Sequence, residues 1–244
     1  MKSYLTHLEC TWCGKTHPHT QPIRTCPSCG KVLFARYDLQ LLKNEVNREV
    51  FTDRPNNMWR FFELMPVIDE SNVVSLGEGV TPLIHAQNLG ESLKISNLYI
   101  KDEGLNPTGS FKARGLSAAV SKAKEVGETK VTMPTAGNAG GALAAYAARA
   151  GIESTIFMPK DAPNANQQEC KILGSKLVLV DGLINDAGRL SQDMAERDQL
   201  FDLSTLREPY RAEGKKTMAL ELAMDLGWRA PDIIIYPTGG GTGI

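Results

Sequence analysis

The sequence predicts an α/β protein in which parallel strands are flanked by helices and preceded by a small cysteine-rich segment. Three observations predict this class. Short apolar runs alternate with helical patterns from Leu98 onward, the order that builds a parallel sheet with helices on both faces. Four of the five cysteines lie within the first 29 residues. Glycine-containing loops follow three of the apolar runs, where such sheets bind ligands.

Composition limits the classes of function. The chain has 244 residues, 42% of them hydrophobic, which is enough to bury a sizeable core. Lys and Arg number 27 against 28 Asp and Glu, so no basic excess points to nucleic acid or to an anionic membrane. No apolar run reaches the ~18 residues of a spanning helix, and the N-terminus lacks the apolar core of a signal peptide. We therefore expect a cytoplasmic protein that acts on a small molecule and binds neither nucleic acid nor membrane.

The first 37 residues are expected to form a zinc ribbon. Cys10 and Cys13 form one CxxC pair, and Cys26 and Cys29 form a second. Four thiolates at this spacing close a tetrahedral zinc site with no open position, so the Zn²⁺ would be structural rather than catalytic. Two disulfides or redox-active CxxC motifs are the alternatives. His17 and His19 lie between the pairs and could compete as ligands, but they are expected to be loop residues. Cys170 is expected to be a buried apolar filler rather than a nucleophile.

The catalytic region is expected to cover residues 38–244. It begins with a predicted short helix at Asp38–Arg48, an apolar-aromatic segment at Trp59–Leu64, and a loop or edge at Val74–Leu83. The apolar periodicity then switches repeatedly between that of a strand and that of a helix. The predicted strands are Leu98–Lys101, Lys130–Met133, Ser154–Met158, Lys176–Val180, Leu200–Leu203 and Asp232–Pro237, and the predicted helices are Phe111–Val126, Ala139–Arg149, Asn164–Leu173, Asn185–Arg197 and Ala212–Leu226.

Three loops are expected at the carboxyl ends of the strands: "NPTGSFKARG", "PTAGNAGG" and "PTGGGTG". The last does not have the spacing of a nucleotide P-loop. Its glycines could direct successive backbone N–H groups at a phosphate, with a threonine adding a hydroxyl, whereas a plain tight turn is the alternative. The residues concerned are Gly239, Gly240, Gly241, Thr242 and Gly243.

Two side chains in the other loops have chemistry that suits a cofactor. Lys112 is expected at the start of a helix capped by Ser110, where the helix dipole should lower the pKa of the lysine toward the neutral amine that forms a Schiff base. The amide of Asn138 can donate and accept hydrogen bonds beside a ring oxygen. Taken singly, they could be a solvated lysine and a helix cap. Together with a phosphate-binding loop, they are the groups that pyridoxal phosphate requires.

These residues resemble a known family. "SFKARG", "TAGNAGG" and the late "GGGTG" are similar to the fold-type II pyridoxal phosphate enzymes, whose fold is that of the tryptophan synthase β subunit. Within that group, "SLGEGVTPL", "EPYRAEGKKT" and the N-terminal cysteine pairs resemble threonine synthase. The resemblance covers nearly the whole chain. The lysine motif is also similar to serine/threonine dehydratases, so it identifies the cofactor better than the substrate.

The resemblance implies roles for the site residues. Lys112 would carry pyridoxal 5'-phosphate, Phe111 would pack against its ring, Asn138 would bond the ring hydroxyl, and Gly239–Gly243 would hold its phosphate. Arg211 would bind the phosphate of O-phosphohomoserine, which water converts to threonine and phosphate, and a homodimer is a further expectation. The alternative for this arginine is a surface salt bridge with a nearby glutamate, either Glu208 or Glu213.

Two departures from the threonine synthase pattern leave other substrates open. In many of these enzymes hydroxyl residues follow the asparagine, whereas Ala139, Gly140 and Gly141 follow it here. The Asn-Ser pair expected ahead of "NPYR" is replaced within "DLSTLREPYR", which leaves Ser204 and Thr205 as substitutes. Phosphoserine or an unphosphorylated amino acid, as in cysteate synthase, diaminopropionate lyase or dehydratase relatives, is the alternative substrate.

The alternative to an enzyme is a non-catalytic interaction module, in which the zinc ribbon sits on a degenerate enzyme scaffold. The intact lysine, asparagine and glycine loop argue against it. Members of the resembled family continue well beyond the position of Ile244, so we expect a C-terminally truncated chain. The remainder of the large domain, including the residue that meets the pyridine nitrogen, would then be missing, and activity of the truncated chain stays open.

Overall fold

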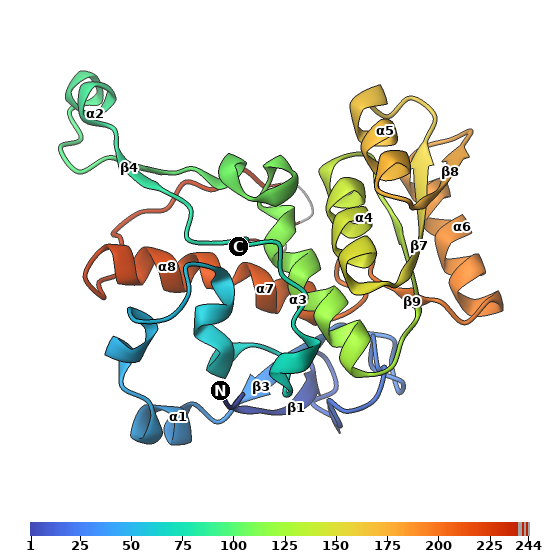
Figure 1. Cartoon of the computed structure of the whole chain (residues 1–244), viewed down its shortest axis with the longest axis horizontal. Coiled ribbons are helices and arrows are strands. Elements are labelled where there is room, and N and C mark those ends of the chain that lie inside the picture. Colours follow the sequence, from blue (N-terminus) through green and yellow to red (C-terminus); the bar gives the residue numbers. More distant parts are fainter. Residues whose placement is uncertain (239–240, 242, 244) are drawn as a thin grey trace.

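A four-stranded parallel sheet is the framework of the computed structural model, which describes residues 1–238, 241 and 243 (Figure 1). The strand order is β8-β7-β6-β9. Its strands are β6 (Lys130–Pro134), β7 (Glu153–Pro159), β8 (Lys176–Val180) and β9 (Phe201–Asp202). All four were predicted from their short apolar runs, and the parallel pairing confirms the predicted fold class.

Helices cover both faces of this sheet, as the alternating pattern predicted. Helices α4 (Asn138–Ala150) and α5 (Asn164–Ile172) lie on one face, and α6 (Ile184–Arg197) lies on the other (Figure 1). Buried residues run almost continuously along β6 and β7, because strands covered on both faces have no solvated side. Helix α3 (Lys112–Glu125) packs in turn on α4 and carries Lys112 at its first position.

The predicted helix at Ala212–Leu226 forms as two helices. Helix α7 (Tyr210–Lys215) ends at Lys215 with Lys216 as its C-cap, and α8 (Thr217–Asp225) begins directly after that cap. At the junction the hydroxyl of Thr217 donates to the backbone carbonyl of Gly214 at 2.7 Å, so a side chain takes a carbonyl that would otherwise serve the helix ladder. The single-helix prediction was therefore wrong at the junction, although both halves are helical.

Two glycines allow α3 and α7 to cross in close contact. A Cβ atom added to Gly214 would lie 2.1 Å from the backbone oxygen of Arg114, and one added to Gly115 would lie 3.0 Å from that of Arg211. Real side chains cannot occupy such positions without moving a backbone. The crossing therefore depends on glycine, and it places the polar residues of α7 beside the first turn of α3.

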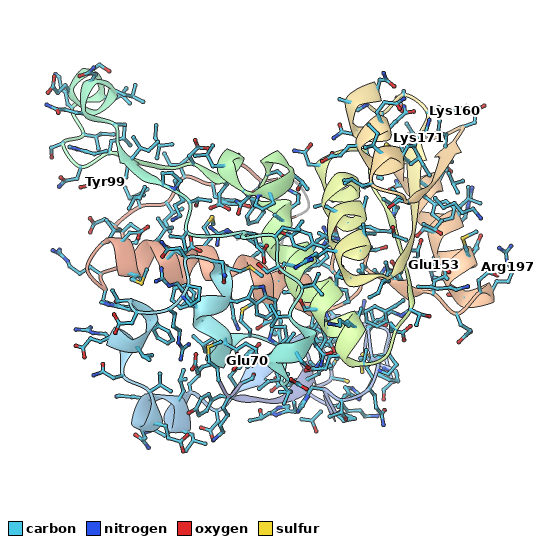
Figure 2. The ribbon with its side chains drawn as sticks, in the orientation of Figure 1. Glu70, Tyr99, Glu153, Lys160, Lys171 and Arg197 are labelled. Atoms are coloured by element: carbon cyan, nitrogen blue, oxygen red, sulfur yellow. The ribbon has the colours of Figure 1, made fainter. Side chains whose placement is uncertain are left out.

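The predicted strand Leu98–Lys101 belongs to a different sheet. Strand β5 (Tyr99–Lys101) pairs antiparallel with β4 (Leu83–His85), which begins at the last residue of the predicted loop or edge Val74–Leu83. Helix α2 (Gln87–Leu93), which was not predicted, connects them. Antiparallel neighbours need only a local connection, whereas a place in the parallel sheet requires a longer crossover. The pair and α2 form a projecting lobe, and Figure 2 shows Tyr99 on it, far from Lys160 on the sheet side.

The predicted strand at Asp232–Pro237 does not form. The segment has no strand assignment, and Ile233 and Ile235 are 81% and 91% exposed. A strand needs a hydrogen-bonded neighbour, and none of the described strands pairs with this segment. The expectation that three loops follow strands of one sheet was accordingly wrong. Only the loop at residues 134–141 follows a strand of the parallel sheet.

The N-terminal segment forms a small antiparallel sheet with the order β2-β1-β3. Leu8 and Leu33 are fully buried and share one apolar core with α3, α4 and the parallel sheet. The domain boundary after residue 37 stays a prediction.

The strands are β1 (Leu5–Cys10), β2 (Thr16–His17) and β3 (Leu33–Tyr37), followed by α1 (Leu39–Glu45) and the 3₁₀ helices η1 (Arg48–Phe51), η2 (Met58–Leu64), η3 (Glu70–Asn72), η4 (Glu103–Leu105) and η5 (Pro107–Gly109).

The predicted helix Asp38–Arg48 is shorter than expected, because Asp38 is its N-cap and the chain leaves the helix at Val46. The segment predicted at Trp59–Leu64 is the 3₁₀ helix η2. None of the helices in the described part of the chain is both long and apolar enough to cross a membrane.

We predict that Gly214→Ala lowers the free energy of unfolding by about 1–3 kcal/mol, because the new methyl group must push α7 away from α3. Gly188→Ala is the matched control. Gly188 lies inside α6 with open space where a Cβ would stand, so the same change should stabilise by about 0.5–1 kcal/mol. Urea unfolding of both variants measures this. Equal effects would contradict the glycine-dependent crossing.

Candidate functional site

Lys112 lies at the start of α3 with its amine over an aromatic ring. Its Nζ is 5.0 Å from the centroid of the Phe111 ring. Its backbone N–H donates to the Ser110 hydroxyl at 3.3 Å, although Phe111 rather than Ser110 is the N-cap residue. Burial, assisted by the nearby charge of Arg211, lowers the pKa of the Lys112 ammonium. The sequence predicted this direction but ascribed it to the helix dipole.

The ring of Phe111 joins two distant segments at the site. The Tyr236 ring meets it edge-on at 5.7 Å, which brings the segment ahead of the glycine loop beside Lys112. From α7, Lys215 places its Nζ 5.1 Å from the centroid of the same ring. In the glycine loop, Gly241 adopts a positive φ of 80° and Gly243 is described, whereas Gly239, Gly240 and Thr242 lie outside the described residues.

Arg211 is a buried cation of α7, only 3% exposed. Its Nη1 donates to the backbone oxygen of Leu203 at 2.8 Å and to the Thr205 hydroxyl at 3.3 Å. Its Nε has no hydrogen-bond partner among the described residues. A buried guanidinium N–H without a partner is costly, so it marks a position where a ligand oxygen would be stabilising.

The expected salt-bridge alternative for Arg211 was wrong. Glu208 accepts the backbone N–H groups of Tyr210 and Arg211 at 2.6 Å and 3.0 Å, and Glu213 accepts from the Tyr37 hydroxyl at 2.7 Å. No carboxylate lies within ion-pair distance of Arg211 in residues 1–238, 241 and 243. Burial raises the pKa of Glu208 to about 7, while the positive charge of Arg211 opposes that shift.

Ser204 and Thr205 differ in their relation to Arg211. The Ser204 hydroxyl and backbone N–H both donate to the carboxylate of Asp202. That carboxylate also lies 3.9 Å from Arg24 of the N-terminal segment. Thr205 instead accepts from the guanidinium. The structure therefore brings Thr205 together with Arg211 and directs Ser204 toward Asp202.

Asn138 is the first residue of α4 and is exposed. The N-cap is Gly137, so the interpretation of this asparagine as the cap was wrong. Its Oδ1 accepts a hydrogen bond from Asn166 at 3.1 Å. The 3₁₀ helix η5 ends two residues ahead of Phe111 and packs against α4. This contact connects the helix that carries Asn138 to the loop that precedes Lys112.

The glycines that follow Asn138 are explained by packing. A Cβ on Gly140 would lie 2.9 Å from Cys170 Sγ, and one on Gly141 would lie 2.0 Å from the Glu169 carboxylate. At Gly140 the buried neighbours Cys170 and Thr135 leave no room for a larger side chain, whereas at Gly141 only the end of the flexible Glu169 side chain stands in the way. Cys170 is fully buried, as predicted, and burial raises the pKa of its thiol to about 11.

Four cysteines at the edge of the N-terminal sheet form a cluster that could hold a metal ion. Their sulfur atoms all lie within 4.8 Å of one another, with Cys10–Cys29 at 3.4 Å and Cys13–Cys26 at 3.7 Å. Four thiolates about 2.3 Å from one zinc ion would be about 3.8 Å apart, so the set fits a tetrahedral site. All four are free, which contradicts the disulfide alternative. Backbone N–H groups, led by that of Cys13, lower the pKa of Cys10 to about 6.

Sequence reasoning missed Lys215, Tyr236 and Thr108. Lys215 follows Arg211 by four residues, a spacing that places both on one helix face, so it could have been found. Tyr236 carried no signal, because its contact with Phe111 depends on the path of an irregular segment. Thr108 adopts a left-handed conformation, and its buried hydroxyl has no partner among the described residues.

Residues 74–244 match the family described as pyridoxal-phosphate dependent enzymes, and the chain belongs to this family. It is 38% identical to the threonine synthase of Methanocaldococcus jannaschii over 232 residues, which cover 95% of this chain and 57% of that protein. It is 35% identical to the threonine synthase of Methanosarcina acetivorans, over 96% of this chain and 56% of the relative. The chain thus spans little more than half the length of these relatives.

A solved structure supports the fold. A pyridoxal 5'-phosphate-dependent aspartate racemase superimposes with a TM-score of 0.55 and 26% identity, over 60% of this chain and 46% of that one. The parallel sheet with helices on both faces is therefore the fold of this enzyme family, as the sequence predicted.

Proposed function

We propose that this chain carries the lysine-bearing part of a pyridoxal phosphate-dependent lyase that converts O-phosphohomoserine and water to threonine and phosphate. The similarity to two threonine synthases over nearly the whole chain supports the reaction. The observation that carries the proposal is the buried Arg211 guanidinium, whose free Nε lies in the same site as the Lys112 amine. A guanidinium is well suited to grip a phosphate group.

The residues present fit the cofactor. The Lys112 amine is partly buried beside the Phe111 ring, and the Tyr236 ring meets the same ring edge-on. Lys112 would hold pyridoxal phosphate covalently, Phe111 would contact its ring, Asn138 would serve the ring hydroxyl, and Gly239–Gly243 would bind its phosphate. When bound, this cofactor draws electrons from the α-carbon of an amino acid and so makes its proton removable.

The side chains of this chain would move protons and hold the leaving group. Lys112, with its lowered pKa, would take the α-proton as a neutral amine and return it later in the cycle. Arg211, oriented by Thr205 and the carbonyl of Leu203, would bind the substrate phosphate and stabilise its charge as it departs. Ser204 would contribute to that site only after releasing Asp202.

One observation favours a second candidate, an elimination or replacement on phosphoserine or an unphosphorylated amino acid. Because Cys170 and Thr135 fill the space over Gly140, a hydroxyl side chain that would assist Arg211 has no room at that position. A panel of phosphorylated and unphosphorylated substrates distinguishes the two reactions. The homodimer and the cytoplasmic location stay predictions.

The metal of the cysteine cluster is proposed to be a structural zinc ion. A closed set of four sulfur ligands suits Zn²⁺ and leaves no position for a substrate or water. Such a site contributes to the folding of its segment and takes no part in the reaction.

We predict that Lys112 is the residue that carries the cofactor. Borohydride reduction of the purified protein loaded with pyridoxal phosphate, followed by peptide mapping, should place the pyridoxyl label on Lys112. Lys112→Ala should lose the visible absorbance of the bound cofactor. A label on Lys215, the nearest competing amine on the Phe111 ring, would overturn the assignment.

We predict that Arg211→Ala lowers kcat/KM for O-phosphohomoserine by about 2–4 kcal/mol in transition-state free energy, because a charged substrate group loses its partner. Cofactor absorbance should stay unchanged. Arg207→Ala, on the exposed part of the same loop, is the control and should change kcat/KM little. An equal loss with phosphoserine and unphosphorylated threonine would mean that Arg211 has a structural role.

We predict about one zinc ion per chain by metal analysis, from the four-ligand arrangement. The double variant Cys10→Ser, Cys26→Ser should lose the metal and unfold the N-terminal sheet, while cofactor absorbance stays largely intact because Lys112 lies on α3. Cys170→Ala, outside the cluster, should keep the metal. Full zinc content in the double variant would refute the site.

A further inference from the structure

One buried carboxylate lies between the two helices that carry Lys112 and Asn138. Glu78, in the loop that precedes β4, is fully buried. Its Oε2 accepts a hydrogen bond from the hydroxyl of Tyr146 on α4 at 2.7 Å, and its Oε1 accepts one from the hydroxyl of Ser117 on α3. The carboxylate therefore bridges the helix that begins at Asn138 to the helix that begins at Lys112.

Three further donors hold this carboxylate in place. The indole Nε1 of Trp59 donates to Oε1 at 3.0 Å. The backbone N–H of Leu76 and the hydroxyl of Ser75 donate to Oε2 at 2.9 Å and 3.3 Å. Each oxygen thus faces one N–H group, which can only donate. A glutamine at this position would direct its own NH₂ group at one of those donors, so the position calls for a carboxylate.

The packing of α3 on α4 leaves their relative position weakly determined. Small side chains let two helices approach closely but interdigitate little, so a shift along the contact meets little steric resistance. Both helices lie entirely within the described residues, no hydrogen bond runs directly between them, and Glu78 is the one described side chain that bonds to both. The buried residues of α4 are mostly small: Gly140, Gly141, Ala142, Ala144, Ala145 and Ala147, with Leu143 and Tyr146 as the larger ones.

The hydroxyl of Tyr146 stays a hydrogen-bond donor at neutral pH. The side chain is fully buried, and burial together with the charge of Glu78 raises the pKa of the hydroxyl, while the charge of Arg114 opposes that shift. Burial also excludes water, which would otherwise compete for the carboxylate. The link from α4 to Glu78 is therefore permanent in the folded protein.

We infer that Glu78 is a positioning residue of the cofactor site, because it fixes α4 against α3 and so sets the distance between Asn138 and Lys112. The inference rests on the proposed function, in which Lys112 holds pyridoxal phosphate and Asn138 serves its ring hydroxyl. Ser117 follows Lys112 by five residues on α3. Tyr146 follows Asn138 by eight residues on α4. One or two helical turns carry the position of each bond to the site, and a hydrogen bond to the ring hydroxyl weakens steeply when its geometry is disturbed.

Removing one hydroxyl tests the inference while the carboxylate keeps its other donors. The measurement follows the visible absorbance of pyridoxal phosphate bound to the purified protein as the pH is changed. Tyr146→Phe should shift the midpoint of this titration by about half a pH unit or more, because a displaced Asn138 no longer stabilises one protonation state of the ring hydroxyl. Ser117→Ala, which removes the bond from α3, should shift it in the same direction.

Tyr210→Phe is the matched control. Tyr210 is also fully buried, but its hydroxyl has no hydrogen-bond partner among the described residues. The same change there removes no bond and should leave the midpoint where it is in the unchanged protein.

A double variant separates positioning from a general loss of structure. Asn138→Ala alone should shift the midpoint, and adding Tyr146→Phe should shift it no further, since Tyr146 acts through Asn138. Additive shifts would overturn the inference.

An unchanged midpoint in both Tyr146→Phe and Ser117→Ala would also overturn the inference, and the proposed function would stand as long as Lys112→Ala loses the cofactor absorbance. Absorbance that persists in Lys112→Ala would overturn the proposed function and the inference together.

Discussion

The buried guanidinium of Arg114 is the interaction on which the geometry of the site depends. It donates to Glu103 ahead of α3, to Glu221 on α8 and to the Thr81 hydroxyl, at 2.6–3.2 Å. Three segments that are distant in sequence are thereby fixed to one residue of α3. Removing one partner of such a buried network costs about 3–5 kcal/mol, because the remaining charges lose their compensation. Lys112 lies two residues earlier on the same helix. The network therefore fixes the backbone position from which the Lys112 side chain extends.

The close crossing at Gly214 is the second constraint on the position of α7. With α8 held by Glu221 and α7 pressed on α3 through Gly214, the polar face of α7 can lie only beside the first turn of α3. The protein thus places a neutral, fully bonded network around Arg114 on α3, and it places Arg211, whose Nε has no hydrogen-bond partner among the described residues, on α7. The first supplies rigidity, and under the proposed function the second would receive the phosphate of the substrate.

How much of this could be predicted from the sequence follows from the range of each interaction. The strands and helices from Lys130 to Arg197 were predicted because their apolar periodicity is local. The antiparallel pairing of β5 and the irregular path of 232–237 were not, because both depend on which neighbour is available for hydrogen bonding. Lys112 and Arg211 were predicted from motifs as site residues, whereas the position of Lys215 beside the Phe111 ring depends on how α7 crosses α3.

The N-terminal segment contacts α7 and the strand that precedes it. The Tyr37 hydroxyl donates to Glu213 of α7, and Arg24 lies 3.9 Å from Asp202, which holds the backbone of Ser204. Both contacts meet the segment that presents Arg211, and neither reaches Lys112. A metal-stabilised sheet would thus brace the side of the site that receives the substrate while leaving the cofactor lysine to the Arg114 network. Under the proposed function, a cysteine cluster with no open ligand position would bear on substrate binding only through these contacts, because they meet the segment that carries Arg211.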